Sequence, residues 1–511
     1  MVHVAAAASD RWDAVVVGSG AGGSSIAFQL AKRGAQVLVV ERGDFLKTDN
    51  DAPDAPIGKY LYDVWPDQCN GQVGGLTKFF GAALYRLRES DFRAVQHENG
   101  MSPAWPVSYS DLAPYYDRAE ELYRVHGDWA GDPSEPPHAS SYPFPPIPHH
   151  PVVAEMAERL TRAGIAVSSI PLALDYGPGG RCTLCPTCDA HYCRRDAKMD
   201  AEIAALRPAL ATKKVQLLTR TECLKVETSP DGRRATAVVV RNQDGVRRIT
   251  ADAVVLSAGI PETAAILRRS RTDRHAAGLG NAGGALGRYH SGHSVGHVFP
   301  LVSARKLRDV HSKTMAINAF HEDADGPLGI IQAVGRMPFW RQAPPFLRPI
   351  IRFIGERSLA FFYATEALPT WHSGVVFQGD EIVAKIEPTH NLTTFAKLRG
   401  VAVEAFRRAG YPVVARARAP YLWHDAGTAC FGADPASSVC DPDCQVHGVS
   451  GLYVVDQSIL PSAGCVNTTL TVIALALRAG DHIARAMREQ DMAQRSARRR
   501  PEDVVDLART G

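Results

Sequence analysis

Three features are missing from this chain of 511 residues, and each absence narrows the class of protein. The net charge is only +3, from 57 Lys and Arg against 54 Asp and Glu, whereas nucleic-acid-binding proteins usually carry a concentrated basic surface. No apolar run is long enough to span a bilayer. The opening MVHVAAAASD has neither the basic start nor the apolar stretch of a signal peptide. We therefore expect a cytoplasmic protein with no transmembrane segment and no nucleic-acid partner.

Composition is that of a large globular protein, with 45% hydrophobic and 22% charged residues. Such a chain can bury one extended core or two intergrown lobes. In the cytoplasm its ten cysteines are expected to stay mostly reduced. The only dense basic cluster, Arg495 to Arg500, is expected to be a solvated and frayed terminus.

A glycine turn between two buried strands is the strongest motif. The stretch 13–42 predicts a strand at Ala14–Val17, a helix at about Ser24–Lys32 and a second strand at Gln36–Val40. Its glycines allow a sharp turn, close approach to a pyrophosphate, and tight packing of the helix on the strand. The helix start offers free N–H groups to the phosphates, and an acid ends the second strand, where it should bind a ribose hydroxyl. The motif predicts a dinucleotide site with the candidate residues Gly18, Gly20, Gly23, Glu41 and Arg42.

A second glycine-rich stretch, Gln72–Phe92, contains Gly74 and Gly75 among apolar and aromatic residues. The glycines let the backbone approach something flat or anionic, and the apolar content argues against a mobile surface loop.

The next two segments are assigned no chemistry. Segment 105–127 predicts a packed helix that begins with a Ser/Asp cap. The proline- and histidine-rich segment 131–151 predicts an extended linker across the surface, because proline fixes its backbone and nothing orders its histidines toward one point.

Four cysteines lie close together in RCTLCPTCDAHYC. Their spacing, C-x2-C-x2-C-x4-C, is compact enough for four thiolates to converge, as in a ferredoxin-type cluster run. The fourth spacing is one residue too long for that run and no proline follows, while His191 offers a further ligand. An iron-sulfur cluster, zinc, a redox disulfide and plain buried thiols therefore all stay open for Cys182, Cys185, Cys188 and Cys193.

Strands of two kinds fill the middle of the chain. Between Val215 and Thr263, alternating runs predict a small antiparallel sheet, and AVVLSAG predicts a buried strand that returns to the dinucleotide site at Ala258. From about Val295 to Arg407, strand-like runs predict a mainly antiparallel sheet that serves as a substrate lobe. The segment MPFWRQAPPFLRPIIRFIGERSL within it is interpreted as packed core with solvated arginines; a lid and a weak membrane-surface contact are the alternatives.

The last block again combines a strand, a turn and a helix. Leu452–Val455 predicts a buried strand with Asp456 at its carboxyl end, and a turn with Asn467 precedes a helix over Thr468–Ala484. Since α/β sheets bind ligands at the carboxyl ends of their strands, these polar residues should face the site opened by Gly18.

Together these motifs resemble the glucose-methanol-choline (GMC) flavoprotein oxidoreductases. The matching segments are GSGAGG with Glu41, VGG...GA, VVLSAGIPET, HDAGT and LYVVDQSILPSAGCVNTTLTVIALALR, in the family's order and almost from end to end. SYSDLAPYYDRAEELY and the cysteine run look closest to the branch of pyranose oxidases and bacterial sugar or polyol dehydrogenases. The resemblance implies an α/β fold, in which a Rossmann-like FAD-binding lobe joins a mainly antiparallel sheet substrate lobe. It also implies oxidation of an alcohol or carbohydrate to a carbonyl.

The resemblance further implies roles for single residues. His424 matches the catalytic histidine of the H-x-x-G-T segment, and Asn467 matches its partner. Asp456 matches the acid near the flavin ribityl chain, and Cys223 falls where a backbone group usually meets adenine. Lys78 stands where some members attach FAD through a histidine, so noncovalent FAD is expected. Thr468, next to Asn467, completes the candidate cofactor residues.

The roles of a histidine and an amide in alcohol oxidation also follow from general chemistry. A hydride leaves an alcohol carbon readily only as the hydroxyl proton is removed, which calls for a base with a pKa near neutral, and histidine suits this task. An amide beside the base can hydrogen-bond the alkoxide. His290, His293 and His447 are interpreted as structural.

The expected organisation is an FAD-binding lobe with an inserted cap over 1–294, a substrate lobe over 295–420, a return over 421–490 and a flexible tail over 491–511. The electron acceptor stays open between oxygen, a quinone and a protein carrier, and a dehydrogenase that uses oxygen poorly is favoured over an oxidase. A NAD(P)-dependent enzyme and a flavin-bearing electron-transfer subunit are the alternatives from other classes.

Overall fold

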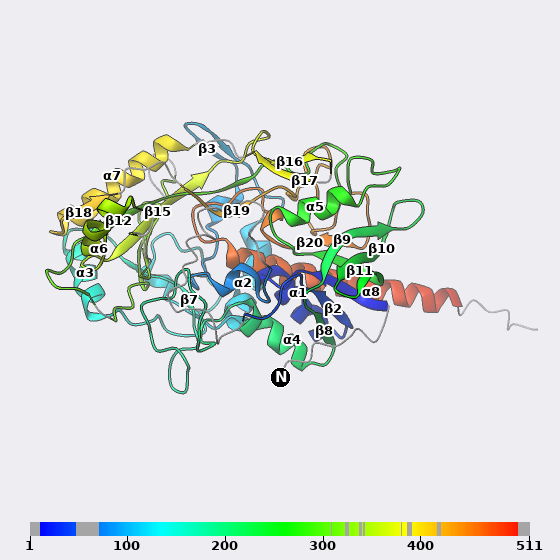
Figure 1. Cartoon of the computed structure of the whole chain (residues 1–511), viewed down its shortest axis with the longest axis horizontal. Coiled ribbons are helices and arrows are strands. Elements are labelled where there is room, and N and C mark those ends of the chain that lie inside the picture. Colours follow the sequence, from blue (N-terminus) through cyan, green and yellow to red (C-terminus); the bar gives the residue numbers. More distant parts are fainter. Residues whose placement is uncertain are drawn as a thin grey trace, which may run out of the picture.

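The computed structural model describes residues 11–46, 71–307, 309–321, 327–336, 340, 343–379, 381–385, 391–415 and 421–498. These residues form two lobes that lie side by side, and each lobe contains a large sheet (Figure 1).

The first lobe contains a seven-stranded sheet made of β1 (Arg11–Val17), β2 (Val37–Val40), β8 (Val215–Leu218), β9 (Glu222–Thr228), β10 (Ala235–Asn242), β11 (Gly245–Leu256) and β20 (Leu452–Val454). The order is β8-β2-β1-β11-β10-β9, and β20 pairs with β11 off this path. The strands β8, β2, β1, β11 and β20 pair in parallel, whereas β9, β10 and β11 form an antiparallel meander. The predicted antiparallel strands are therefore present, as an extension of the dinucleotide-binding sheet.

Helices cover this sheet because their small and apolar residues allow close packing. α1 (Ala21–Lys32) packs against α8 (Thr469–Arg498), and α2 (Tyr109–Leu122) packs against α8 as well. At the first contact a Cβ on Gly480 would lie only 2.7 Å from Cγ of Gln29, so the glycine sets the spacing of the two helices. The predicted cap of α2 is confirmed, since the Ser108 hydroxyl accepts from the backbone N–H of Asp111 at 3.2 Å. The short helices α4 (Arg207–Ala211) and α5 (Glu262–Arg269) complete the lobe.

The last helix is longer than predicted. α8 continues past Ala484 to Arg498 and projects from the body of the molecule (Figure 1). Its extension RAMREQDMAQRSAR contains no glycine or proline and is rich in residues that favour helix, so nothing stops the helix where its apolar face ends. The first part of the expected tail over 491–511 is thus helical, and residues 499–511 lie outside the described ranges.

The second lobe contains an antiparallel sheet made of β6 (Ser168–Ser169), β12 (Ser291–Pro300), β13 (Met315–Ile317), β14 (Ile330–Val334), β15 (Ala360–Ala367), β18 (Val413–Ala415) and β19 (Tyr421–Ala426). The order is β18-β12-β15-β14-β13-β6, with β19 also paired to β12. Every described pair is antiparallel, which confirms the prediction for this lobe. α7 (Leu392–Arg408) packs on β15 and contacts α3 (Pro151–Arg162).

The described residues also form three two-stranded sheets: β3 (Val95–His97) with β4 (Gly100–Ser102), β5 (Val125–His126) with β7 (Leu172–Ala173), and β16 (Gly374–Gln378) with β17 (Glu381–Lys385). The expected boundary between residues 294 and 295 falls inside β12, and β6 and β19 both come from segments expected in the first lobe. The chain therefore crosses between the lobes at β6, β12 and β19.

The interpretation of the arginine- and phenylalanine-rich segment as packed core is wrong. Among its described residues, α6 (Arg348–Gly355) has no buried residue, and Phe346, Ile350 and Phe353 are 77%, 58% and 57% exposed. The apolar positions fall on one side of a short surface helix that no other described element covers closely.

The surface-linker prediction for segment 131–151 is also wrong in part. The His138 side chain is buried, with Nε2 at 3.0 Å from Oε1 of Glu135, and the Tyr142 hydroxyl donates to the same oxygen at 2.8 Å. The prolines do keep the backbone extended, but the buried carboxylate draws the ring side chains inward.

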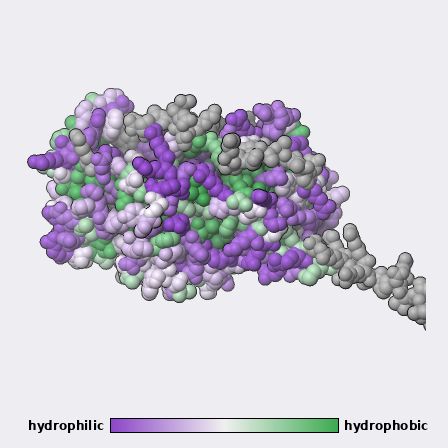
Figure 2. All heavy atoms as spheres, turned by 90° about the horizontal axis from the view of Figure 1, so that it is seen from below, coloured by the Kyte–Doolittle hydropathy of each residue, from purple (hydrophilic) through white to green (hydrophobic). Residues whose placement is uncertain are grey.

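None of the helices in the described ranges combines the length and apolar character needed to cross a membrane. Viewed from below, the surface is mainly hydrophilic, with hydrophobic side chains visible toward the middle of that face (Figure 2).

Candidate active site

The carboxyl ends of four parallel strands meet at one edge of the first sheet. β1, β2, β11 and β20 pair in register there, and each leads into a residue predicted to bind the cofactor. These residues are Gly18, Glu41, Ala258 and Asp456. The predicted convergence of the amino-terminal and carboxyl-terminal motifs is therefore present.

Glycines let the turn after β1 pass close to neighbouring backbone. Gly18 has a φ of +97°, and a Cβ there would lie 2.2 Å from the carbonyl oxygen of Ser257. A Cβ on Gly23 would lie 2.0 Å from the carbonyl oxygen of Gly18, which accounts for the tight packing of α1 on β1. At both positions any other residue would have to displace backbone atoms.

In front of the turn the same loop is open. Among the described residues, a Cβ on Gly20 would meet no atom within 4 Å, and no side chain of these residues caps the start of α1. The N–H groups at this helix start therefore have no side-chain acceptor among the described residues, and they carry a partial positive charge. Gly74 donates its N–H to the Ser19 hydroxyl at 3.1 Å, so the second glycine segment lies against the first. Gly75 lies beside Gly20, where an added Cβ would come within 2.9 Å of Cα. Open space before an uncapped helix start fits a dinucleotide pyrophosphate.

The acid at the end of β2 is held in place by the protein. Glu41 accepts from the N–H of Ser19 at 3.0 Å and from its hydroxyl at 2.7 Å, and its other oxygen accepts from the N–H of Gly43 at 2.9 Å. Arg42 instead forms an ion pair with Glu262 at 2.9 Å. Cys223 lies at the start of β9, which is tied to Glu41 by the N–H of Thr221 at 3.0 Å.

Asp456 joins the ends of β11 and β20. One oxygen accepts from the N–H of Gly259 at 2.8 Å and from the Thr263 hydroxyl at 2.6 Å, and the other accepts from the N–H of Ser458 at 2.8 Å. Thr468, buried at the start of α8, accepts from the Gln457 side chain at 3.2 Å.

His424 lies on β19 at an irregularity in its pairing with β12. The register shifts between Ser291–Ala426 and His293–Trp423, so two residues of β19 oppose only Gly292. His424 has a φ of +54°, an uncommon value for a residue with a side chain. Such a bulge changes the direction of a side chain, and here it directs the imidazole toward the segment before α8.

Asn467 meets this imidazole. Its Nδ2 lies 3.0 Å from Nε2 of His424, and its Oδ1 accepts from Nε2 of Gln332 at 3.2 Å. The predicted pair of histidine and amide is thus in direct contact. Gln332, on β14, was not predicted, because nothing in the strand IIQAV distinguishes a glutamine that faces the site from one that faces solvent.

His293 is the second residue that the sequence interpretation missed. It was taken as structural, but its Nδ1 lies 2.8 Å from Nδ1 of His424. Its Nε2 lies 3.2 Å from the carbonyl oxygen of Ala463 and 3.0 Å from that of Gly464. The partner of His424 comes from the facing strand β12, and this pairing is not visible in the local motif GRYHSGH.

Burial keeps both imidazoles neutral near neutral pH. It lowers the pKa of His293 from 6.5 to about 4. It also lowers the pKa of His424 well below its usual value, and the nearby His293 and Lys313 lower it further. An unprotonated imidazole has a free lone pair and can accept a proton.

The other two histidines lie in surroundings that suit a structural role. His290 Nε2 is 2.9 Å from Oδ1 of Asp425. His447 Nε2 is 2.9 Å from the Ser438 hydroxyl and 3.2 Å from the carbonyl oxygen of Gly432.

The cysteine run gives no support to a metal centre. Within the described ranges, no group of three or more His, Cys, Asp and Glu side chains could hold a metal ion. Cys182, Cys185, Cys188 and Cys193 are free thiols. The segment is fixed instead by the buried Lys198, whose ammonium donates to the carbonyl oxygens of Phe80, Cys188 and His191 at 2.6–3.0 Å. The cysteine segment is therefore held through its backbone carbonyl oxygens and by a lysine just beyond it.

Lys78 is likewise committed to the protein. Its buried ammonium lies 2.7 Å from Oε2 of Glu202 and 3.0 Å from Oδ2 of Asp200.

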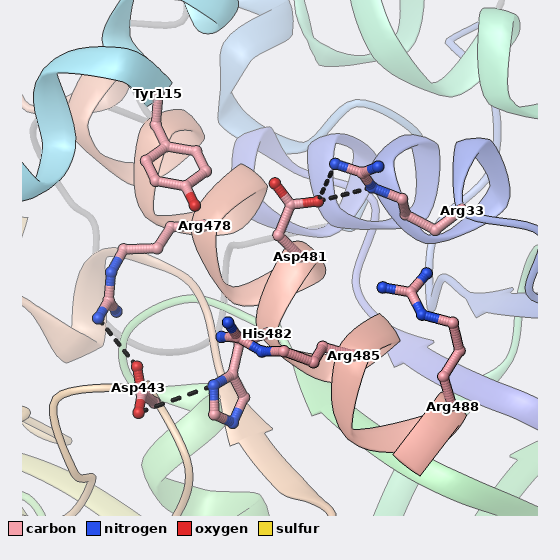
Figure 3. Close-up of a pocket in the computed structure, with 8 residues that line it drawn as sticks. All are labelled: Arg33, Tyr115, Asp443, Arg478, Asp481, His482, Arg485 and Arg488. Atoms are coloured by element: carbon pink, nitrogen blue, oxygen red, sulfur yellow. Dashed lines mark hydrogen bonds and ion pairs between the residues drawn. The ribbon is translucent and has the colours of Figure 1, made fainter. Parts of the chain in front are cut away.

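A separate pocket of about 320 Å³ lies beside the middle part of α8 (Figure 3). Its two carboxylates are already paired: Asp481 with Arg33 at 2.7 Å and Asp443 with Arg478 at 2.9 Å. It contains none of the predicted site residues. The pocket is lined by Arg33, Tyr115, Asp443, Arg478, Asp481, His482, Arg485 and Arg488.

Comparison with known proteins agrees with this arrangement. Residues 68–298 and 395–476 match the two family models of GMC oxidoreductases, and residues 16–53 match an NAD(P)-binding Rossmann-like domain. The chain is 31% identical to paromamine 6'-oxidase of Streptomyces fradiae, over 93% of this chain and 91% of that protein. It is 25% identical to 2-methyl-1,2-propanediol dehydrogenase of Mycolicibacterium austroafricanum, over 93% and 96% of the two chains.

Among solved structures, a formate oxidase from Aspergillus oryzae has the same fold. Its TM-score is 0.62 at 16% identity, with 94% of this chain and 99% of that chain covered. The family models, the extended identity and the shared fold together show that the chain belongs to the GMC oxidoreductases, a family of FAD-binding enzymes.

Proposed function

We propose that this enzyme uses noncovalently bound FAD to oxidise a CH–OH group of an alcohol or carbohydrate to a carbonyl, with His424 as the general base and Asn467 as the partner of the alkoxide. The observation that carries the proposal is the contact of Asn467 Nδ2 with His424 Nε2 at 3.0 Å. It brings a neutral base and an amide donor together, as alcohol oxidation requires.

The cofactor would be held at three places. These are the open glycine turn after β1, the carboxylate of Glu41 and Asp456 at the end of β20. FAD, when bound, supplies the acceptor for the hydride that leaves the alcohol carbon. Lys78 supports the noncovalent mode, because its ammonium is held by Glu202 and Asp200 and the position has no imidazole.

The two side chains divide the proton chemistry. A substrate hydroxyl that replaces the contact between them donates its proton to Nε2 of His424, while its oxygen accepts from the amide of Asn467. The amide stabilises the alkoxide as negative charge develops. Gln332 keeps the Asn467 oxygen turned away, so that the NH₂ group faces the base.

The substrate class rests on the relatives. Two of them are named for oxidation of a sugar-containing compound and of a diol, which supports a sugar, glycoside or polyol for this chain. Their names include both an oxidase and a dehydrogenase, and therefore support either acceptor. Our proposal is a dehydrogenase that uses oxygen poorly. An oxidase is the alternative, and the similarity to paromamine 6'-oxidase supports it. A quinone and a protein carrier are the other acceptors, and the cytoplasmic location stays a prediction.

The test is an absorption spectrum of the purified protein followed by anaerobic addition of polyols, sugars and aminoglycosides. We expect flavin bands that bleach with at least one alcohol, and a yellow supernatant after acid precipitation. Colour that stays in the pellet would contradict noncovalent binding. A colourless protein that oxidises alcohols only with added NAD(P) would contradict the flavin assignment. Comparing peroxide formation in air with reduction of an artificial dye then separates oxidase from dehydrogenase.

A further inference from the structure

The hydrogen bonds around His293 determine where its proton lies. Its Nε2 faces the carbonyl oxygens of Ala463 and Gly464, at 3.2 and 3.0 Å. A carbonyl oxygen only accepts, so Nε2 must carry a proton to donate. Burial lowers the pKa of His293 to about 4, so the ring holds a single proton at neutral pH. Its Nδ1 is then an unprotonated acceptor.

The same reasoning fixes the proton of His424. The Nδ1 atoms of the two rings are 2.8 Å apart, and two acceptors at that distance would repel each other. His424 must therefore donate from Nδ1. Because this ring is also neutral, its Nε2 has no proton and its lone pair faces Asn467.

The amide at the other end agrees with this assignment. Asn467 places Nδ2 toward His424 and Oδ1 toward the NH₂ group of Gln332. Each contact in the series then has one donor and one acceptor. The direction runs from Gln332 through Asn467 to one side of His424, and from the other side of that ring through His293 to the backbone.

We propose that His293 is a positioning residue that keeps the proton of His424 on Nδ1 and so leaves Nε2 free to act as the base. The proposal rests on the proposed function and adds to it the residue that selects the reactive tautomer. When Nε2 takes up the substrate proton, Nδ1–H of the resulting imidazolium still donates to His293. The same contact thus serves the ring before and after proton transfer.

Two substitutions separate this role from a structural one. His293→Leu removes the acceptor while retaining bulk, whereas His293→Asn retains an oxygen near the position of Nδ1. We expect His293→Leu to lower the rate of flavin reduction by about 10²-fold, at the lower end of the contribution of a positioned base. Asn should recover at least about a tenth of the wild-type rate. The loss should appear in kcat more than in KM, since His293 touches His424 and not the substrate.

The tautomer itself is read by NMR of the protein with isotope-labelled histidine, with the His424 signals assigned through a His424→Gln variant. In the wild type we expect a protonated Nδ1 and an unprotonated Nε2. In His293→Leu this preference should be lost, and in His293→Asn it should return. His126→Leu is the control, because His126 is also buried between two backbone carbonyls but belongs to the separate small sheet of β5 and β7. It should lower thermal stability without changing the His424 signals.

A wild-type spectrum with the proton on Nε2 of His424 would overturn the proposal without any variant of His293. Equal rate losses in His293→Leu and His293→Asn, with the His424 signals unchanged, would reduce His293 to a structural residue. Failure of the proposed function gives a different result. In that case His424→Gln would leave flavin reduction intact, while the tautomer pattern would still be observed.

Discussion

Two clusters of polar side chains lie largely inside this molecule, and they differ in whether their side chains are charged. In the first, Arg86 and Arg88 keep their charge. Arg86 pairs with Glu120 and Asp117, each at 2.7 Å, and Arg88 pairs with Asp132 and Glu135, each at 2.8 Å. In the second, the side chains of His293, His424, Asn467 and Gln332 are all neutral.

The difference explains why only the second cluster is suited to chemistry. Burial by itself would raise the pKa of Glu135, but Arg88 and His138 beside it lower the value to about 2. That carboxylate is too weak a base near neutral pH. In the histidine cluster, burial removes the charge and leaves a lone pair available. Ion pairing therefore fixes structure in one region, and neutralisation leaves an imidazole lone pair available in the other.

The largest expected effect lies in the neutral cluster. His424→Ala should slow flavin reduction by about 10²–10⁴-fold, the usual contribution of a positioned general base. Anaerobic stopped-flow measurement with a good substrate gives the rate. His447→Ala changes a half-buried loop histidine held by Ser438 and Gly432; it is the control and should leave the rate unchanged. An unchanged rate in the His424 variant would remove that residue from the mechanism.

Substitutions in the cluster of Arg86 and Arg88 should lower the stability of the folded protein. Arg86→Leu leaves Glu120 buried without its partner and should lower the free energy of unfolding by about 3–5 kcal/mol. Arg11→Leu removes an exposed ion pair with Asp252, and should cost at most about 1 kcal/mol. Denaturant titration of both variants tests the comparison. Similar losses of unfolding free energy in the two variants would show that burial does not increase the contribution of the Arg86 ion pair.

A smaller effect concerns the dependence of stability on pH. His293 has a pKa of about 4 in the folded protein and 6.5 when unfolded, so the unfolded chain binds more protons between these values. Stability from this group is present above pH 6.5 and is lost as the pH falls to about 4. The loss amounts to about 3 kcal/mol.

The buried Glu366 has the opposite effect on stability over part of the pH range between 4 and 6.5. Burial raises the pKa of Glu366 to about 8, so its contribution to stability increases as the pH falls toward 4.5. The measurement is therefore the difference between wild type and His293→Asn in denaturant titrations across this range. The variant should gain stability relative to wild type as the pH falls. A constant difference would mean that His293 does not change its protonation on unfolding.

Local sequence was sufficient to predict the strand-turn-helix-strand edge of the first sheet, and it was insufficient to predict the contacts of His424 and Asn467 with His293 and Gln332. Gly18, Gly20 and Glu41 lie within one strand-turn-helix-strand unit, whose spacing fixes their geometry. His293 and Gln332 reach the site through pairing of strands far apart in the chain, and the register of such pairs is not encoded in either strand alone. The Pro- and His-rich segment was misjudged for a related reason, because Glu135 draws it toward the buried Arg88.

The cysteine run shows a different limit. Spacing indicates which thiols are able to converge, but it does not show that Lys198, beyond the run, binds the backbone carbonyl oxygens of Cys188 and His191. The exposed face of α6 was not predicted, because the sequence of an apolar segment does not indicate whether another element covers it.

The irregular pairing of β19 has a consequence for how this enzyme can change. Side chains alternate between the two faces of a strand, so the extra residue opposite Gly292 decides which face the imidazole of His424 occupies. Deleting Asp425 would remove the extra residue and should turn the imidazole of His424 to the opposite side of the sheet. Within this short segment, a change of length is therefore more damaging than a change of side chain at any single position other than His424. Natural or engineered variation in chain length should be tolerated only outside it.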